Sequence, residues 1–171
     1  MSQKQNEGSK QDLSGLINKH LLYTYDNGWK YESWIKSPTR IVYKIHGGPM
    51  GGRDNYQTIS CRVVREPSKE TGEQGVYLIS WLEETGTVVS MTIDFTNNKV
   101  NSFICFSKGH WENPQIAHGH YKKEQWRQLA KVPGGESITT DRTIISESAT
   151  LSEVTEGRGE LEDVAEDAPT L

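Results

Sequence analysis

The strongest constraint on the fold of this chain is an alternation of aromatic and polar residues from Tyr23 to Tyr31, interrupted by Asn27-Gly28. Alternation at period two places Tyr23 and Tyr25 on one face of a β-strand. An Asn-Gly pair between two such runs is a strong signal for a β-hairpin. The two phenol groups, about 6–7 Å apart along the strand, could donate hydrogen bonds to one small anionic or phenolic ligand. The alternative at this point is that the rings only pack in a core.

Short strand signals of the same kind recur along the chain. The expected strands are 20–26, 29–36, 40–46, 56–65, 75–83, 87–95, 99–106 and 137–145, with short helices at 12–19 and 123–131. Many short strands joined by tight turns favour an antiparallel sheet closed into a β-barrel. We therefore predict an all-β fold with short flanking helices and a central cavity.

The two ends of the chain are too polar to form a core of their own. Only 33% of the 171 residues are hydrophobic, and the mean hydropathy is -0.70. Residues 1–11 lack bulky apolar side chains after Met1, and residues 150–171 are rich in Glu, Asp and Thr. Such segments bury too little apolar surface to offset their ordering entropy. We expect disordered tails at 1–11 and 150–171 around one domain of residues 12–149.

Composition argues against several classes of protein. The net charge is -4, and no basic stripe with interleaved aromatics indicates a nucleic-acid surface. Cys61 and Cys105 lie in strand-like runs without metal or redox spacing, so reduced thiols are the default and one disulfide is the alternative. His118 and His120 alternate near His110, but no carboxylate follows at ligand spacing, so we expect no metal. Without an apolar span or signal segment, we expect a soluble, cytoplasmic protein and no membrane partner.

A second group of candidate residues carries opposite charges. Arg53 follows a glycine-rich corner, and Trp81 and Glu83 share one face of a strand. If the sheet closes into a barrel, that face and the tyrosines point into the same interior. A carboxyl group among aromatic rings would be poorly hydrated, which raises its pKa and lets it donate a proton near neutrality. Arg53 could then hold an anionic group. An Arg–Glu pair at the rim of the barrel is the alternative at this point.

Three blocks of the sequence resemble the phenolic acid decarboxylase family. They are His20–Glu32, then Tyr43–Gly48 continuing to Gly52-Arg53, and Gly75–Thr87, so that the resemblance covers roughly residues 13–116. The resemblance implies a lipocalin-like β-barrel with a central cavity, and commonly a homodimer. It also implies removal of carbon dioxide from 4-hydroxycinnamic acids, such as coumaric, ferulic or caffeic acid, to give 4-vinylphenols. No cofactor and no metal are implied.

The same resemblance implies roles for individual residues. The implied catalytic residues are Tyr23, Tyr25, Arg53 and Glu83, and the expected substrate-binding residues are Tyr31, Tyr43, Trp81 and Thr87. In this chemistry the ionised para-hydroxyl pushes electrons through the ring, and the alkene carbon next to the carboxylate accepts a proton. The resulting quinone methide loses carbon dioxide. Glu83 would be the general acid, and the tyrosines would stabilise the phenolate or the carboxylate.

Four positions depart from the family pattern. Val88 replaces an acidic residue, Asp54 a bulky aromatic, and Asn101-Ser102 a His-Gly pair. These departures leave the catalytic residues intact but bear on the shape of the pocket and on the substrate. Two other functions therefore remain open: an isomerase, dehydratase or cyclase acting on a phenolic or quinone-methide-like product, and a non-catalytic barrel that binds a small aromatic ligand.

Overall fold

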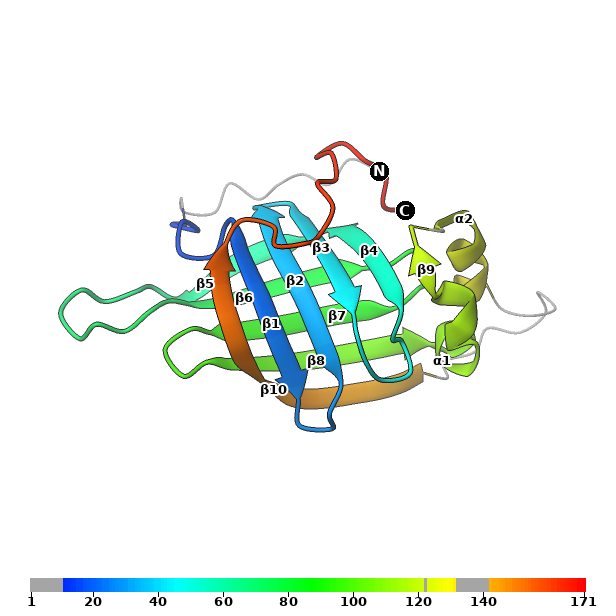
Figure 1. The fold of residues 1–171 in the computed structure, drawn as a ribbon, viewed down its shortest axis with the longest axis horizontal. Helices are drawn as coiled ribbons and strands as arrows, with labels where there is room; N and C mark the ends of the chain where they lie inside the picture. The colour runs from blue at the N-terminus through cyan, green and yellow to red at the C-terminus, as the bar shows by residue number, and fades with distance from the viewer. Residues whose placement is uncertain (1–10, 122, 132–141) are drawn as a thin grey trace.

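The protein is an all-β fold built on one ten-stranded sheet. The computed structural model describes residues 11–121, 123–131 and 142–171. The strands are β1 (Lys19–Tyr25), β2 (Lys30–Ser37), β3 (Arg40–Ile45), β4 (Arg53–Thr58), β5 (Ser60–Arg65), β6 (Val76–Leu82), β7 (Val88–Asp94), β8 (Lys99–Ser107), β9 (Gly119–His120) and β10 (Arg142–Glu156). In Figure 1, β1–β4 form a layer that crosses the layer of β6–β8 behind it.

The long strand β10 joins the two layers. Its first half pairs with β8 and its second half with β1, and the order across the sheet is β5-β6-β7-β8-β10-β1-β2-β3-β4-β9. All neighbours are antiparallel except β4 and β9, which are parallel. Within the described residues the order ends at β5 and β9, which do not pair. The antiparallel all-β fold is therefore confirmed, whereas closure of the sheet into a barrel is not.

The hairpin expected at Asn27-Gly28 is present between β1 and β2. The backbone nitrogen of Tyr25 donates to the carbonyl of Trp29, and that of Gly28 donates to the carbonyl of Tyr25. Gly28 has a φ of +87°, a conformation that glycine adopts without steric cost. This turn sets the register in which Tyr23 stands opposite Tyr31. Both side chains therefore point into the space between the layers.

Two expected elements differ in the structure. The helix expected at 12–19 is a series of turns, because Asn18 adopts a φ of +63° before β1 begins and a helix this short is costly to nucleate. The single strand expected at 56–65 is two strands, since the chain turns at Ile59, whose nitrogen donates to the carbonyl of Thr39. β4 therefore pairs with β3, whereas β5 pairs with β6.

Short helices close one end of the sheet, at the right of Figure 1. They are α1 (Lys108–Glu112), a 3-10 helix at Pro114–Ala117, α2 (Lys123–Trp126) and a second 3-10 helix at Arg127–Ala130. The last two correspond to the helix expected at 123–131. No helix among the described residues is long and apolar enough to cross a bilayer.

The C-terminal region does not behave as the separate tail that its composition suggested. β10 continues to Glu156, and the segment after it (residues 157–171) runs along β2–β4 in Figure 1. Leu161 and Val164 are buried against Trp34 and Val42. A few well-spaced apolar residues anchor an otherwise acidic segment, which average composition does not reveal. The first ten residues, and residues 137–141 of the strand expected at 137–145, lie outside the described residues.

The main core fills the space between the two layers. Its fully buried aliphatic residues include Leu21, Ile35, Ile41, Ile79 and Ile93. Cys61 and Cys105 are free thiols, as expected. The core is not filled completely by aliphatic side chains, and its polar part forms the candidate site.

Candidate active site

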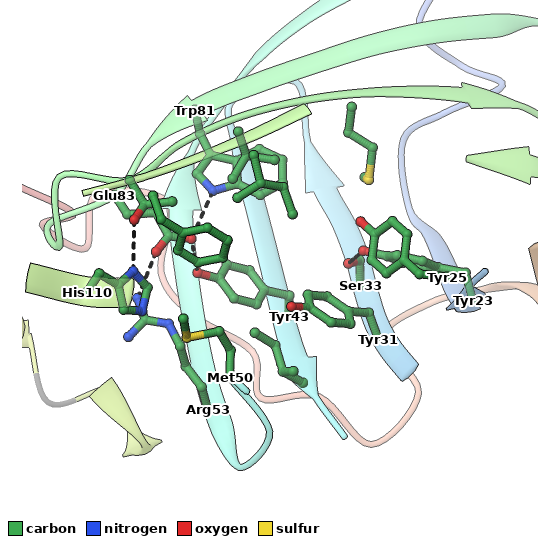
Figure 2. Close-up of a pocket in the computed structure, with 16 residues that line it drawn as sticks. Tyr23, Tyr25, Tyr31, Ser33, Tyr43, Met50, Arg53, Trp81, Glu83 and His110 are labelled. Atoms are coloured by element: carbon green, nitrogen blue, oxygen red, sulfur yellow. Dashed lines mark hydrogen bonds and ion pairs between the residues drawn. The ribbon is translucent and has the colours of Figure 1, made fainter. Parts of the chain in front are cut away.

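A cavity between the layers brings together all eight residues expected from the sequence. Its lining consists of Tyr23, Tyr25, Tyr31, Ser33, Tyr43, Ile45, Met50, Arg53, Trp81, Glu83, Thr87, Val89, Met91, Ile104, Phe106 and His110. Figure 2 shows two ends: Tyr23, Tyr25 and Ser33 lie at one, and Arg53, Glu83 and His110 lie at the other. The free volume, counted as the space that the centre of a water molecule can reach, is about 30 Å³. This is room for roughly two or three waters.

The first end, which we call the tyrosine end, is held by hydroxyl pairs. The hydroxyl of Tyr23 lies 3.1 Å from Ser33 Oγ on β2, and that of Tyr25 lies 2.6 Å from Ser102 Oγ on β8. The ring of Tyr25 packs edge-on against that of Tyr31 with centroids 5.2 Å apart. The sequence analysis missed both serines. Strand parity could have indicated Ser33, which shares a face with Tyr31, but nothing local connects Ser102 to Tyr25.

The phenol groups at this end remain protonated over the physiological range. Burial raises the pKa of Tyr23 to about 12 and raises the pKa values of Tyr25 and Tyr31 well above the ordinary value. The hydroxyls of Tyr23 and Tyr25 are thus neutral hydrogen-bond donors in a poorly hydrated space. Such donors can stabilise an oxyanion without adding a charge of their own.

The second end, the charged end, is centred on Glu83, which follows β6 in a tight turn. The nitrogen of Glu83 donates to the carbonyl of Thr87, and Gly86 closes the turn with a φ of +79°. The carboxyl group is only 6% exposed. Oε1 accepts from the Tyr43 hydroxyl at 2.6 Å and from Trp81 Nε1 at 3.3 Å. This turn therefore aims the carboxyl into the cavity.

Arg53, the first residue of β4, pairs with Glu83 through Nη2 and Oε2 at 3.0 Å. Its guanidinium stacks on the ring of Trp126 at 3.9 Å and donates to the carbonyl of Ala117 at 3.2 Å. The structure therefore places the positive charge of Arg53 directly against the carboxyl group of Glu83. The pair is buried, not at the rim of the sheet.

A second buried ion pair lies behind Arg53. Glu84 accepts from Asn55 Nδ2 at 2.9 Å and from Gln57 Nε2 at 2.6 Å, and it pairs with Lys123 Nζ at 3.3 Å. It also lies 3.6 Å from the guanidinium of Arg53. Burial lowers the pKa of Lys123 to about 8, although the charge of Glu84 opposes this shift. Sequence analysis missed this pair, because its members are far apart in the chain and no motif joins them.

His110, on α1, completes the charged end. The hydroxyl of Thr87 lies 2.8 Å from its Nδ1, and the side chain is almost fully buried. Burial, with the nearby charge of Arg53, lowers the pKa of His110 to about 3. The sequence analysis considered this residue only as a metal ligand with His118 and His120. In the structure those two contact Pro49 and Asp54 instead, so the three histidines do not meet.

Three of the four departures from the family pattern lie away from the cavity. Val88 is 44% exposed. Asp54 pairs with Lys44 at 3.8 Å, and Asn101 accepts from Ser148 on the exposed surface. None of these three contributes a side chain to the cavity, whereas the fourth departure, Ser102, contacts the hydroxyl of Tyr25 in its lining.

Comparisons with known proteins identify the family of the chain. The profile of the family described as phenolic acid decarboxylase (PAD) matches residues 13–170. The "Probable phenolic acid decarboxylase" of Vibrio cholerae is 33% identical over 108 residues, which cover 62% of this chain and 57% of that protein. Phenolic acid decarboxylase PadC of Bacillus subtilis is 36% identical over 105 residues, covering 61% of this chain and 60% of that protein.

A solved structure from Burkholderia vietnamiensis, provisionally named a beta-lactamase, is similar in fold. It has a TM-score of 0.51 and 13% sequence identity, with 86% of this chain and all of that chain covered. At this identity the likeness concerns the fold alone. The matched region spans less than two thirds of the length of the two curated relatives, whereas the family profile spans nearly all of this chain. The chain therefore belongs to the phenolic acid decarboxylase family.

Proposed function

We propose that the protein decarboxylates 4-hydroxycinnamic acids to 4-vinylphenols in this cavity without a cofactor. The observation that carries the proposal is the convergence of a buried carboxyl, Glu83, and two neutral phenol donors, Tyr23 and Tyr25, on one cavity. The names of the curated relatives, both decarboxylases of phenolic acids, support the same class of reaction.

The reaction divides between the two ends of the cavity. The substrate's para-hydroxyl gives its proton to solvent, and the phenolate pushes electrons through the ring and the alkene. The carbon next to the carboxylate takes a proton from Glu83, which gives a quinone methide. The carbon–carbon bond to the carboxylate then breaks, its electrons restore the aromatic ring, and carbon dioxide leaves. A proton returns to the product phenolate, and Glu83 regains one from solvent, so that atoms and charge balance.

This division fixes the direction of the substrate. The carbon that accepts the proton must lie within hydrogen-bond reach of Glu83, and it is bonded directly to the carboxylate. The phenolic oxygen lies at the opposite end of the conjugated system, beside Tyr23 and Tyr25. Neutral donors there stabilise the phenolate as it forms, and the carboxylate lies at the charged end of the cavity.

The cavity must widen to admit this substrate, because its free volume holds only a few waters. Met50 lies in the turn between β3 and β4, where Gly48 and Gly52 both have a φ of +86°. Methionine has a flexible side chain that adapts to changes in packing. We propose that a shift of this turn opens the cavity. Barrel closure and the homodimer implied by the family remain predictions.

The direct test is turnover of p-coumaric and ferulic acids, followed by the loss of absorbance of the conjugated acid and by release of the 4-vinylphenol. Cinnamic acid, which lacks the para-hydroxyl, is the matched control, because no phenolate can form on it. Turnover of the hydroxylated acids alone, without added metal, supports the proposal. Tight binding without turnover would instead favour a non-catalytic binding protein, and reaction of cinnamic acid would rule out the phenolate route.

A further inference from the structure

Nε2 of His110, a residue that lines the cavity, is a fully buried polar atom with no hydrogen-bond partner among the described residues. The side chain is only 1% exposed. Buried polar atoms in proteins are almost always hydrogen-bonded, and leaving one unpaired costs about 1–3 kcal/mol. The unpaired hydroxyl of Tyr77 is the useful contrast, because Tyr77 does not line the cavity. Because His110 lines the cavity, a bound ligand is a candidate partner for this atom.

The rest of the imidazole is held firmly. Thr87 Oγ1 lies 2.8 Å from Nδ1, and the ring of Phe106 packs edge-on against it with centroids 5.3 Å apart. The helix that carries His110 is capped by Ser107, whose side chain accepts from the His110 nitrogen. At Gly109 a side chain would meet the carbonyl of Leu129 at 2.2 Å, so this helix approaches the neighbouring backbone closely. The free nitrogen thus has a fixed direction.

The surroundings keep the ring uncharged. The charged and titratable groups that act on it are Arg53 from β4, Glu84 from the β6–β7 turn and His118. Burial and the repulsion of Arg53 together keep its pKa near 3, so the imidazole is neutral at physiological pH. When the Thr87 hydroxyl donates to Nδ1, the ring proton resides on Nε2. His110 then presents a neutral N–H donor at the charged end.

We propose that His110 binds the carboxylate of the substrate by donating a hydrogen bond from Nε2. This inference rests on the proposed function and on the direction of the substrate given above. It adds a binding residue at the end where carbon dioxide leaves, opposite the tyrosines that hold the phenolate.

A neutral donor suits this position better than a cation. The carboxylate is charged in the bound substrate but becomes neutral carbon dioxide, so a contact that is strong in the ground state must weaken as the bond breaks. A strong ionic contact here would stabilise the substrate more than the transition state and slow the reaction. A neutral imidazole orients the carboxylate at a smaller cost to the rate.

Two unreactive ligands separate this role from a purely structural one. The first, 3-(4-hydroxyphenyl)propionate, has the carboxylate but no alkene; the second, 4-ethylphenol, lacks the carboxylate. Replacing His110→Leu should weaken binding of the acid about 10- to 100-fold, as for a lost hydrogen bond to a charged group, and leave binding of the phenol within about twofold. His110→Gln, which keeps an N–H donor, should restore most of the affinity for the acid.

A measurement on the unaltered protein covers the case in which the leucine variant does not fold. Nitrogen-15 shifts of the imidazole report the tautomer and the hydrogen bond at Nε2. The acid should shift the Nε2 signal, 4-ethylphenol should not, and Nδ1 should keep the shift of an acceptor. An Nε2 signal that neither ligand moves, or equal weakening of both ligands by His110→Leu, would overturn the inference. Stronger weakening of 4-ethylphenol would overturn it by reversing the direction of the substrate.

The same experiments distinguish this inference from the proposed function. If the protein binds the acid through His110 but does not turn over p-coumaric acid, the proposed function fails and the binding role stands. If turnover is normal and His110→Leu changes neither KM nor acid binding, the binding role fails alone. In a working enzyme, His110→Leu should raise KM for p-coumaric acid by more than it lowers kcat, because the contact is made chiefly in the ground state.

Discussion

The two ends of the cavity are built from different kinds of side chain. At the tyrosine end, the phenols of Tyr23 and Tyr25 are neutral and are positioned by serine hydroxyls. At the charged end, Glu83 is buried against Arg53, and a second ion pair lies directly behind. The difference teaches that hydroxyl partners are enough to position neutral side chains in a buried site, whereas buried charges are accompanied by opposite charges beside them.

The origin of the two ends in the chain differs as well. The tyrosine end comes from regular strands, where parity decides which side chains point inward. The charged end comes from the turn after β6, the start of β4 and the short helices, where no simple periodicity applies. The variants below separate the contributions of these two ends.

The largest effect is expected for Glu83→Gln, which keeps the shape of the side chain but cannot release a proton. The value of kcat for p-coumaric acid should fall on the order of 10²–10⁴-fold, as for loss of a general acid. Steady-state kinetics at saturating substrate measures it. Glu84→Gln is the adjacent control, since Glu84 does not line the cavity, and its loss of kcat should be much smaller. A Glu83→Gln enzyme with near-normal kcat would show that Glu83 is not the proton donor.

Lys123→Met should show how far the charged end depends on its second ion pair. It leaves the buried Glu84 with Arg53, 3.6 Å away, as its remaining cationic neighbour, so the loss should lie below the roughly 3–5 kcal/mol typical of an unpaired buried charge. The change is read from the free energy of unfolding in denaturant. The double variant Lys123→Met with Glu84→Gln removes both charges and should recover much of the loss. Equal stability of the single and double variants would show that the two side chains are not coupled.

Tyr25→Phe tests the tyrosine end. Loss of one oxyanion donor costs on the order of 10²-fold in kcat, with little change in stability. Tyr77→Phe is the matched control, because its hydroxyl is buried without a partner and lies outside the cavity lining. That variant should keep full activity. Equal activities of the two variants would mean that the Tyr25 hydroxyl does not contact the reacting oxyanion.

The pH dependence of stability probes the neutral imidazole of His110 at the charged end. The pKa of His110 is about 3 when folded, against 6.5 for an ordinary histidine. Below pH 6.5 the unfolded chain therefore binds a proton that the folded ring does not, so stability is fully present above 6.5 and falls as the pH drops. The slope is at most about 1.4 kcal/mol per pH unit. Subtracting the pH profile of His110→Gln should isolate this slope, and identical profiles would contradict the buried neutral ring.

Ser102→Ala should have the smallest effect. It removes the partner of the Tyr25 hydroxyl but not the hydroxyl itself, and one such hydrogen bond is worth about 0.5–1.5 kcal/mol. We expect a several-fold loss in kcat/KM for p-coumaric acid. A loss as large as that of Tyr25→Phe would show that the serine, rather than the phenol, is the important donor at this end.

The sequence predicted the parts of the molecule that depend on local periodicity. The alternation around Asn27-Gly28 was enough to place Tyr23 and Tyr25 on one inward face, and parity also paired Trp81 with Glu83. It could not predict contacts that exist only after distant segments meet, such as Lys123 with Glu84 or Ser102 with Tyr25. It also missed the docking of the acidic C-terminal segment, because only Leu161 and Val164 in that segment are large buried apolar residues.

The central claim is that the phenolic oxygen lies at the tyrosine end and the reacting carbon lies beside Glu83. The most direct measurement is a crystal structure of the protein with 3-(4-hydroxyphenyl)propionate, which cannot react through the alkene. We predict that the phenolic oxygen is within hydrogen-bond distance of the Tyr23 and Tyr25 hydroxyls and that the carboxylate contacts His110. A carboxylate bound to the two tyrosines, or a ligand bound outside the cavity, would contradict the account.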